Sequence, residues 1–138
     1  AILLVIIGGF IWGAVSFNSG TRTWRNVERE ELDSQWQTYF KIPIQATDIT
    51  CWMKDGFGGQ KYFECSLTEK GLSYYLKQHD WAMEPIDSPI TIDHPLEEEG
   101  QRTFFSGQYY KESEKDGGHI TLIYLPEKER LFMEDSTR

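Results

Sequence analysis

The sequence has little of what most catalytic and metal-binding sites require. Its 138 residues include two cysteines and three histidines, and no spacing between any of them matches a metal-ligand pattern. The motifs GxSxG, HExxH and CxxC, a P-loop, and a GxGxxG that opens a helix are all absent. No pair of carboxylates stands out as a tuned acid and base. The sequence therefore predicts a protein that is not an enzyme and has no cofactor, metal or small-molecule substrate, with an envelope hydrolase as the weakest alternative.

Positive charge is also scarce. The chain has 14 lysines and arginines against 22 aspartates and glutamates, a net charge of −8. Because nucleic-acid binding depends on a basic surface, the composition argues against a nucleic-acid partner. An acidic surface of this kind is instead compatible with a basic partner. Residues 84–101 contain three prolines and an acidic run, which predicts a loop, and the candidate partner surface on it consists of Asp93, Glu97, Glu98 and Glu99.

The longest apolar run lies at the N-terminus. Residues 1–17, AILLVIIGGFIWGAVSF, carry no charge and show no polar face. As a helix they would span roughly 25 Å, close to the ~30 Å hydrocarbon core of a bilayer. We interpret them as a retained single-pass transmembrane anchor, and a signal peptide cleaved after AVS is the alternative. Gly9 and Gly13 form a GxxxG spacing, which predicts close packing on a helix of a larger membrane protein or complex.

The rest of the chain is long enough for one domain. Residues 18–24 are predicted as a polar connector and residues 25–138 as a soluble α+β domain. Apolar spacing predicts helices over 26–40 and 68–81, the second with Thr68 as N-cap. Strands are expected over 46–54, 61–67, 102–111, 119–125 and 130–135. Because helices and strands do not alternate regularly, we expect an antiparallel sheet of about four to five strands, packed by one or two helices.

Two hairpin registers follow from the sequence. A symmetrical turn over residues 126–129 places Tyr124 opposite Leu131. A turn centred on Gly58 places Cys51 opposite Cys65, since each lies seven positions away. Directly opposed residues have Cα atoms about 4.5–5.5 Å apart, near the range of a disulfide. The spacing therefore predicts a disulfide between Cys51 and Cys65, with two reduced cysteines packed as small apolar side chains as the alternative.

The predicted disulfide and the flanking charges disagree about location. A disulfide favours the periplasm or another extracytoplasmic space. Arg22, Arg25 and Arg29 follow the apolar run closely, and the positive-inside rule places such residues on the cytoplasmic side. We expect the extracytoplasmic location, and the cytoplasmic side stays open.

Together these features predict a non-enzymatic accessory or assembly subunit of a membrane protein complex, in which a single-pass anchor carries an interaction domain. The alternative is a membrane-tethered binding module or inhibitor, of the kind represented by immunity proteins. Such a module would use its acidic surface against a basic partner.

Overall fold

The computed structural model describes residues 16–18, 20–54, 59–113 and 117–136. Within them the elements follow in the order β1 (Ser16–Asn18), β2 (Thr21–Val27), the 3-10 helix η1 (Arg29–Glu31), α1 (Ser34–Tyr39), β3 (Thr47–Lys54), β4 (Gln60–Ser66), α2 (Glu69–His79), β5 (Glu84–Pro85), β6 (Ile90–Asp93), β7 (Gln101–Phe104), β8 (Gln108–Ser113), β9 (His119–Leu125) and β10 (Arg130–Ser136).

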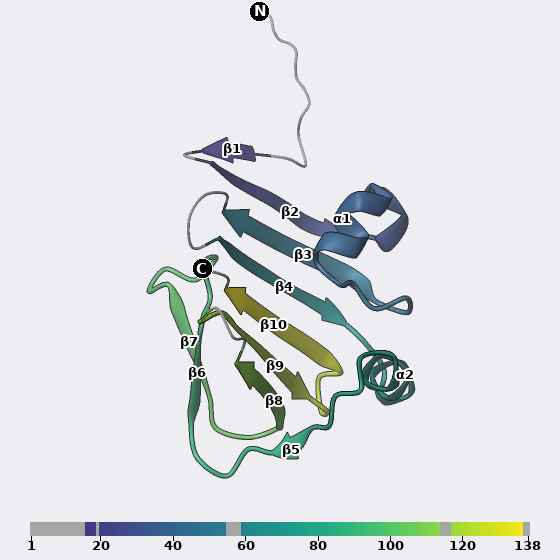
Figure 1. Ribbon diagram of the computed structural model, residues 1–138, viewed down its shortest axis with the longest axis vertical. Coiled ribbons are helices and arrows are strands. Elements are labelled where there is room, and N and C mark those ends of the chain that lie inside the picture. Colours follow the sequence, from purple (N-terminus) through teal and green to yellow (C-terminus); the bar gives the residue numbers. More distant parts are fainter. Residues whose placement is uncertain (1–15, 19, 55–58, 114–116, 137–138) are drawn as a thin grey trace, which may run out of the picture.

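The strands form one large sheet and one separate hairpin. The sheet has eight strands in the order β1-β2-β3-β4-β10-β9-β8-β5, and its neighbouring strands pair antiparallel. The second sheet consists of β6 and β7 alone. In Figure 1 the large sheet runs from β1 at the top to β5 at the bottom, with α1 and α2 on the right and β6 and β7 on the left.

The large sheet is the middle layer, because apolar side chains on both of its faces are buried. Alternate residues of a strand point to opposite faces. Phe63 on β4 and Leu131 on β10 therefore join the cluster that also contains Leu72 and Tyr75 of α2. Their sequence neighbours Tyr62 and Phe132 join a second cluster, on the other face, with Ile92 of β6 and Phe104 of β7. Burial on both faces also explains why residues 120–124 of β9 and 131–135 of β10 are buried without interruption.

The helix α2 agrees with the sequence prediction. The hydroxyl of Thr68 accepts a hydrogen bond of 3.1 Å from the backbone N–H of Gly71, as an N-cap residue should. The helix ends at Asp80, whose φ of 57° is left-handed.

The first predicted helix is much shorter than expected. Its first residues belong to β2, and only Ser34–Tyr39 form α1. Pairing with β3 stabilises the extended form of residues 21–27, a long-range effect that helical spacing does not reveal.

The fold-class prediction is therefore wrong in its proportions. The described residues form two α-helices, one 3-10 helix and ten strands, eight of them in one sheet, instead of a sheet of about four to five strands. Residues 84–101 were expected to be a loop but contain β5 and β6. These two strands are short and contain or adjoin prolines, so their sequence resembles that of a loop. The strand expected over 102–111 is divided into β7 and β8. Residues 21–24 of the predicted connector lie in β2.

The predicted membrane anchor is corrected as well. No helix among the described residues is long and apolar enough to cross a bilayer. Residues 16 and 17, the predicted end of the anchor, lie in β1. Residues 1–15, with Gly9 and Gly13, lie outside the described part of the chain. The single-pass localisation, with its extracytoplasmic domain, is thus replaced by a β-rich domain that has no spanning helix among its described residues.

One predicted register is confirmed and the other is wrong. Tyr124 lies opposite Leu131, as expected. Cys51, however, lies opposite Phe63, and Cys65 lies opposite Leu131. The β3–β4 pairing is thus displaced by two residues from the predicted one, which keeps both cysteines on the same buried face. Diagonal positions of this kind are about 7–8 Å apart, beyond the usual span of a disulfide. Both thiols are free in the structure.

We therefore expect two reduced and unreactive thiols. Burial raises the pKa of both, that of Cys65 to about 12, and the thiolate is the reactive form. A chromogenic thiol reagent should find no reactive thiol in the native protein and two after unfolding without reductant. In the Cys65→Ala variant, the number of thiols that react in the unfolded protein should fall to one. Absence of reactive thiols in the unfolded, unreduced protein would show instead that the predicted disulfide exists.

Candidate functional site

The connection between β6 and β7 carries the predicted acidic surface. Asp93 ends β6, and Glu97, Glu98 and Glu99 follow in the turn. All four residues are exposed. Two backbone hydrogen bonds close the turn. The N–H of His94 donates to the carbonyl of Gly100 at 2.9 Å, and the N–H of Gly100 donates to the carbonyl of Glu97 at 3.0 Å. The structure thus brings the four predicted residues together at one tip, which we call the acidic tip.

Beneath the acidic tip, a buried histidine joins the hairpin to the large sheet. The His94 side chain lies 2.7 Å from the Tyr62 hydroxyl through Nε2. The same nitrogen is 3.5 Å from Glu64 Oε1. The Tyr62 hydroxyl in turn donates to Glu64 Oε1 at 3.0 Å. The two rings also pack together, with centroids 4.6 Å apart. A residue of the hairpin is thereby fixed on two residues of β4.

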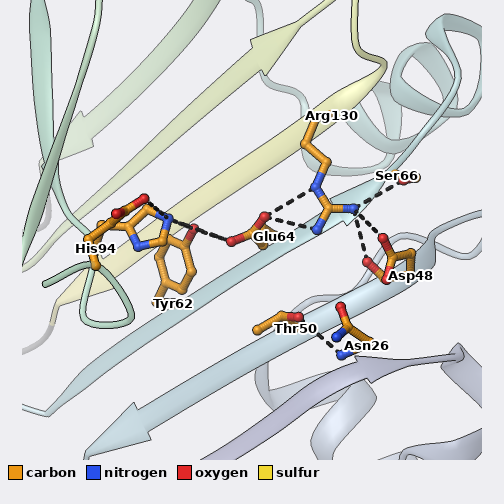
Figure 2. A network of polar contacts seen from close by, with 9 residues as sticks. Asn26, Asp48, Thr50, Tyr62, Glu64, Ser66, His94 and Arg130 are labelled. Carbon is orange, nitrogen blue, oxygen red and sulfur yellow. Dashed lines mark hydrogen bonds and ion pairs between the residues drawn. The ribbon is translucent and has the colours of Figure 1, made fainter.

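The far side of Glu64 is held by an arginine from β10. Arg130 donates to Glu64 Oε2 through Nη2 at 2.9 Å and through Nε at 3.2 Å. Its Nη1 donates to the Asp48 carbonyl and the Ser66 hydroxyl, both at 3.0 Å. Figure 2 shows this chain of contacts running from His94 through Glu64 to Arg130 and Asp48. We call it the Glu64 network.

The electrostatics of the Glu64 network favour fixed charges over proton transfer. Burial alone would raise the pKa of Glu64, but hydrogen bonds from His94 and Arg130 outweigh it and lower the pKa to about 2. Burial and the neighbouring Glu64 carboxylate raise the pKa of Tyr62. The carboxylate therefore stays ionised and the phenol stays protonated near neutral pH. A general acid and base would need pKa values closer to the working pH, so the network is suited to holding the hairpin in place.

A pocket of about 250 Å³ opens between the acidic tip and the sheet. Its walls come from β3, β4, β10 and the β6–β7 hairpin. Figure 1 shows the tip of the hairpin beside the end of β10. Its lining consists of Trp52, Gln60, Lys61, Tyr62, Asp93, Pro95, Gly100, Glu134, Asp135 and Ser136.

A serine, a histidine and a glutamate lie in line beside this pocket. Ser136 Oγ is 2.9 Å from His119 Nδ1, and His119 Nε2 is 2.9 Å from Glu134 Oε1. Hydrolases use such a set with the serine on Nε2 and the acid on Nδ1, the reverse of the order found here. Their serine also commonly stands on a sharp turn, whereas Ser136 lies on a strand.

These three residues have a structural role in the fold. Glu134 Oε2 accepts a hydrogen bond from the backbone N–H of Asp93, so the set links β9, β10 and the hairpin. Burial raises the pKa of Glu134 despite the neighbouring His119. Within the described part of the chain, no group of three or more His, Cys, Asp and Glu side chains is placed to hold a metal ion.

Sequence reasoning found the acidic tip but missed the residues that position it. Glu64 and Arg130 are 66 residues apart in the chain, and His94 and Tyr62 are 32 apart. No local spacing connects such residues. The one sequence signal was the presence of polar residues within apolar strands, at Glu64 and Glu134.

Comparisons with known proteins returned no match: no protein-family model, no curated protein and no solved structure resembles this chain closely enough to indicate a relationship. Its function is therefore argued from the geometry of the acidic tip, the pocket and the Glu64 network.

The Glu64 network should make stability depend on acid pH. The pKa of the Glu64 carboxyl is lowered from 4.5 to about 2. The stability that this carboxylate contributes is therefore present above pH 4.5 and is lost as the pH falls toward 2. At ~1.4 kcal/mol per pKa unit, the full effect is roughly 3 kcal/mol. We expect Glu64→Gln to lower the free energy of unfolding at neutral pH, and this loss to shrink as the pH falls. Urea denaturation across this pH range measures it.

Glu99→Gln is the matched control, because this exposed carboxylate has no described partner. Its free energy of unfolding should follow the wild type at every pH. A loss in Glu64→Gln that stayed constant between neutral and acid pH would contradict the lowered pKa.

Proposed function

We propose that this domain is a non-enzymatic interaction module that binds a basic protein partner through the acidic tip. One observation carries the proposal: four carboxylates stand exposed on a hairpin tip whose base is fixed to the sheet by His94. A surface that is already in its bound shape loses little conformational entropy on association. The net charge of −8 adds a long-range attraction for a basic partner.

The geometry supports binding better than catalysis. Tyr62 and Glu64 are held in fixed protonation states. The serine, histidine and glutamate beside the pocket are engaged with one another and with the hairpin backbone. The side chains of the acidic tip, in contrast, are exposed and accessible to a partner, although Glu97 also lies 3.9 Å from His94 Nε2.

A capped hexalysine peptide is a suitable first probe for this proposal. Exposed charge pairs contribute up to about 1 kcal/mol each, so neutralising Glu97, Glu98 and Glu99 together should weaken binding about tenfold or more. Binding should also weaken as salt is added. Isothermal titration calorimetry of the variant Glu97→Gln, Glu98→Gln, Glu99→Gln measures the effect.

The matched control neutralises three exposed acids elsewhere, in the variant Glu30→Gln, Asp87→Asn, Glu127→Gln. It changes the net charge equally and should bind almost as well as the wild type. Equal weakening in both variants would show that only net charge matters, and would overturn the assignment to the acidic tip.

A further inference from the structure

The pocket under the acidic tip has the size of a site for one side chain. Its volume of about 250 Å³ lies below the roughly 300–1,000 Å³ of most small-molecule sites. Asp93, Pro95 and Gly100 border it from the hairpin, so the acidic tip forms part of its rim. A basic segment bound on the tip would therefore pass over the mouth of this pocket.

The lining charges favour a cation. Asp93 and Glu134 supply carboxylates to the pocket from the hairpin side of the sheet. Lys61 and Asp135 also border the pocket, but they alternate with Tyr62 and Glu134 along their strands, so their side chains lie on the helix side. There Lys61 pairs with Asp135 at 3.3 Å and donates to the Tyr39 carbonyl of α1. Its ammonium group therefore does not offset the two carboxylates on the hairpin side.

The Asp93 carboxylate is available to a ligand. No described residue donates a hydrogen bond to its oxygens, although its backbone N–H is bonded to Glu134. A ligand donor that enters from the tip would meet this carboxylate at the rim.

An aromatic wall distinguishes between the two kinds of basic side chain. Trp52 is half-buried and lines the pocket, and its ring makes no ring or cation contact with another described residue. Tryptophan is the best aromatic acceptor for a cation. A planar guanidinium stacks on such a ring and donates to carboxylates in pairs, whereas an ammonium group is a compact and strongly hydrated charge.

Resting on the proposed function, we propose that this pocket receives an arginine side chain of the basic partner, with its guanidinium between Trp52 and the carboxylates of Asp93 and Glu134. The acidic tip attracts the basic segment, and the pocket selects arginine over lysine within it.

The test compares two capped hexapeptides of equal charge, hexalysine and the same peptide with one central arginine. The wild-type protein should bind the arginine peptide about fivefold more tightly or better, the range expected for a partly desolvated cation on an aromatic ring. Replacing that arginine with uncharged citrulline should abolish the gain. Titration calorimetry at constant salt measures all three.

Variants then assign the preference to the pocket. Asp93→Asn and Trp52→Leu should each remove most of the preference for arginine. Trp52→Phe keeps a ring and should retain part of it, which separates loss of the aromatic wall from a defect in folding. Asp87→Asn, a neutralised exposed acid outside the pocket, should leave the preference intact.

The outcomes separate the two proposals. Equal binding of both peptides to the wild type overturns the arginine pocket and leaves the interaction module standing. A preference that survives in both Asp93→Asn and Trp52→Leu also overturns the pocket. Failure of both peptides to bind overturns the pocket and the proposed function together.

Discussion

The ion pair between Arg130 and Glu64 is the contact on which the placement of the hairpin depends. Both side chains are largely removed from water, so each charge needs the other to offset its loss of hydration. Arg130 occupies one carboxylate oxygen and leaves the second to Tyr62 and, at longer range, His94. The ion pair thus holds a charged acceptor beneath the hairpin, and a buried histidine can fix the hairpin there because that acceptor is present.

From this arrangement follow the two features that carry function in our account. The hairpin covers one face of the sheet with its apolar residues and projects its polar connection past the end of β10. That projection creates the exposed acidic tip and, beneath it, the pocket that Trp52 and Glu134 line. A hairpin that moved freely would lose binding energy to its own ordering. The polar network is therefore the link between the fold and the proposed recognition of a basic partner.

The sequence predicted features that depend on neighbours in the chain. The N-cap of α2 and the pairing of Tyr124 with Leu131 follow from local spacing, and both are present. Prediction from the sequence failed where the backbone conformation or the strand register depends on segments far apart in the chain. Residues 21–27 are extended because β3 pairs with them, and the bulge between Thr47 and Thr50 accompanies a register that separates Cys51 from Cys65. The β6–β7 hairpin was missed because β6 is short and lies between two prolines, and because β7 and β8 were expected to be one strand. No local pattern relates Arg130 to His94.

Amide hydrogen exchange in Arg130→Gln tests the central claim most directly, since this variant removes the charge and keeps a polar side chain. If Arg130 and Glu64 position the hairpin, the amides of β6 and β7 will exchange faster than in the wild type. Those of α2, on the other face of the sheet, will keep their wild-type rates. Unchanged protection in the hairpin, or an equal acceleration in α2, would contradict the account.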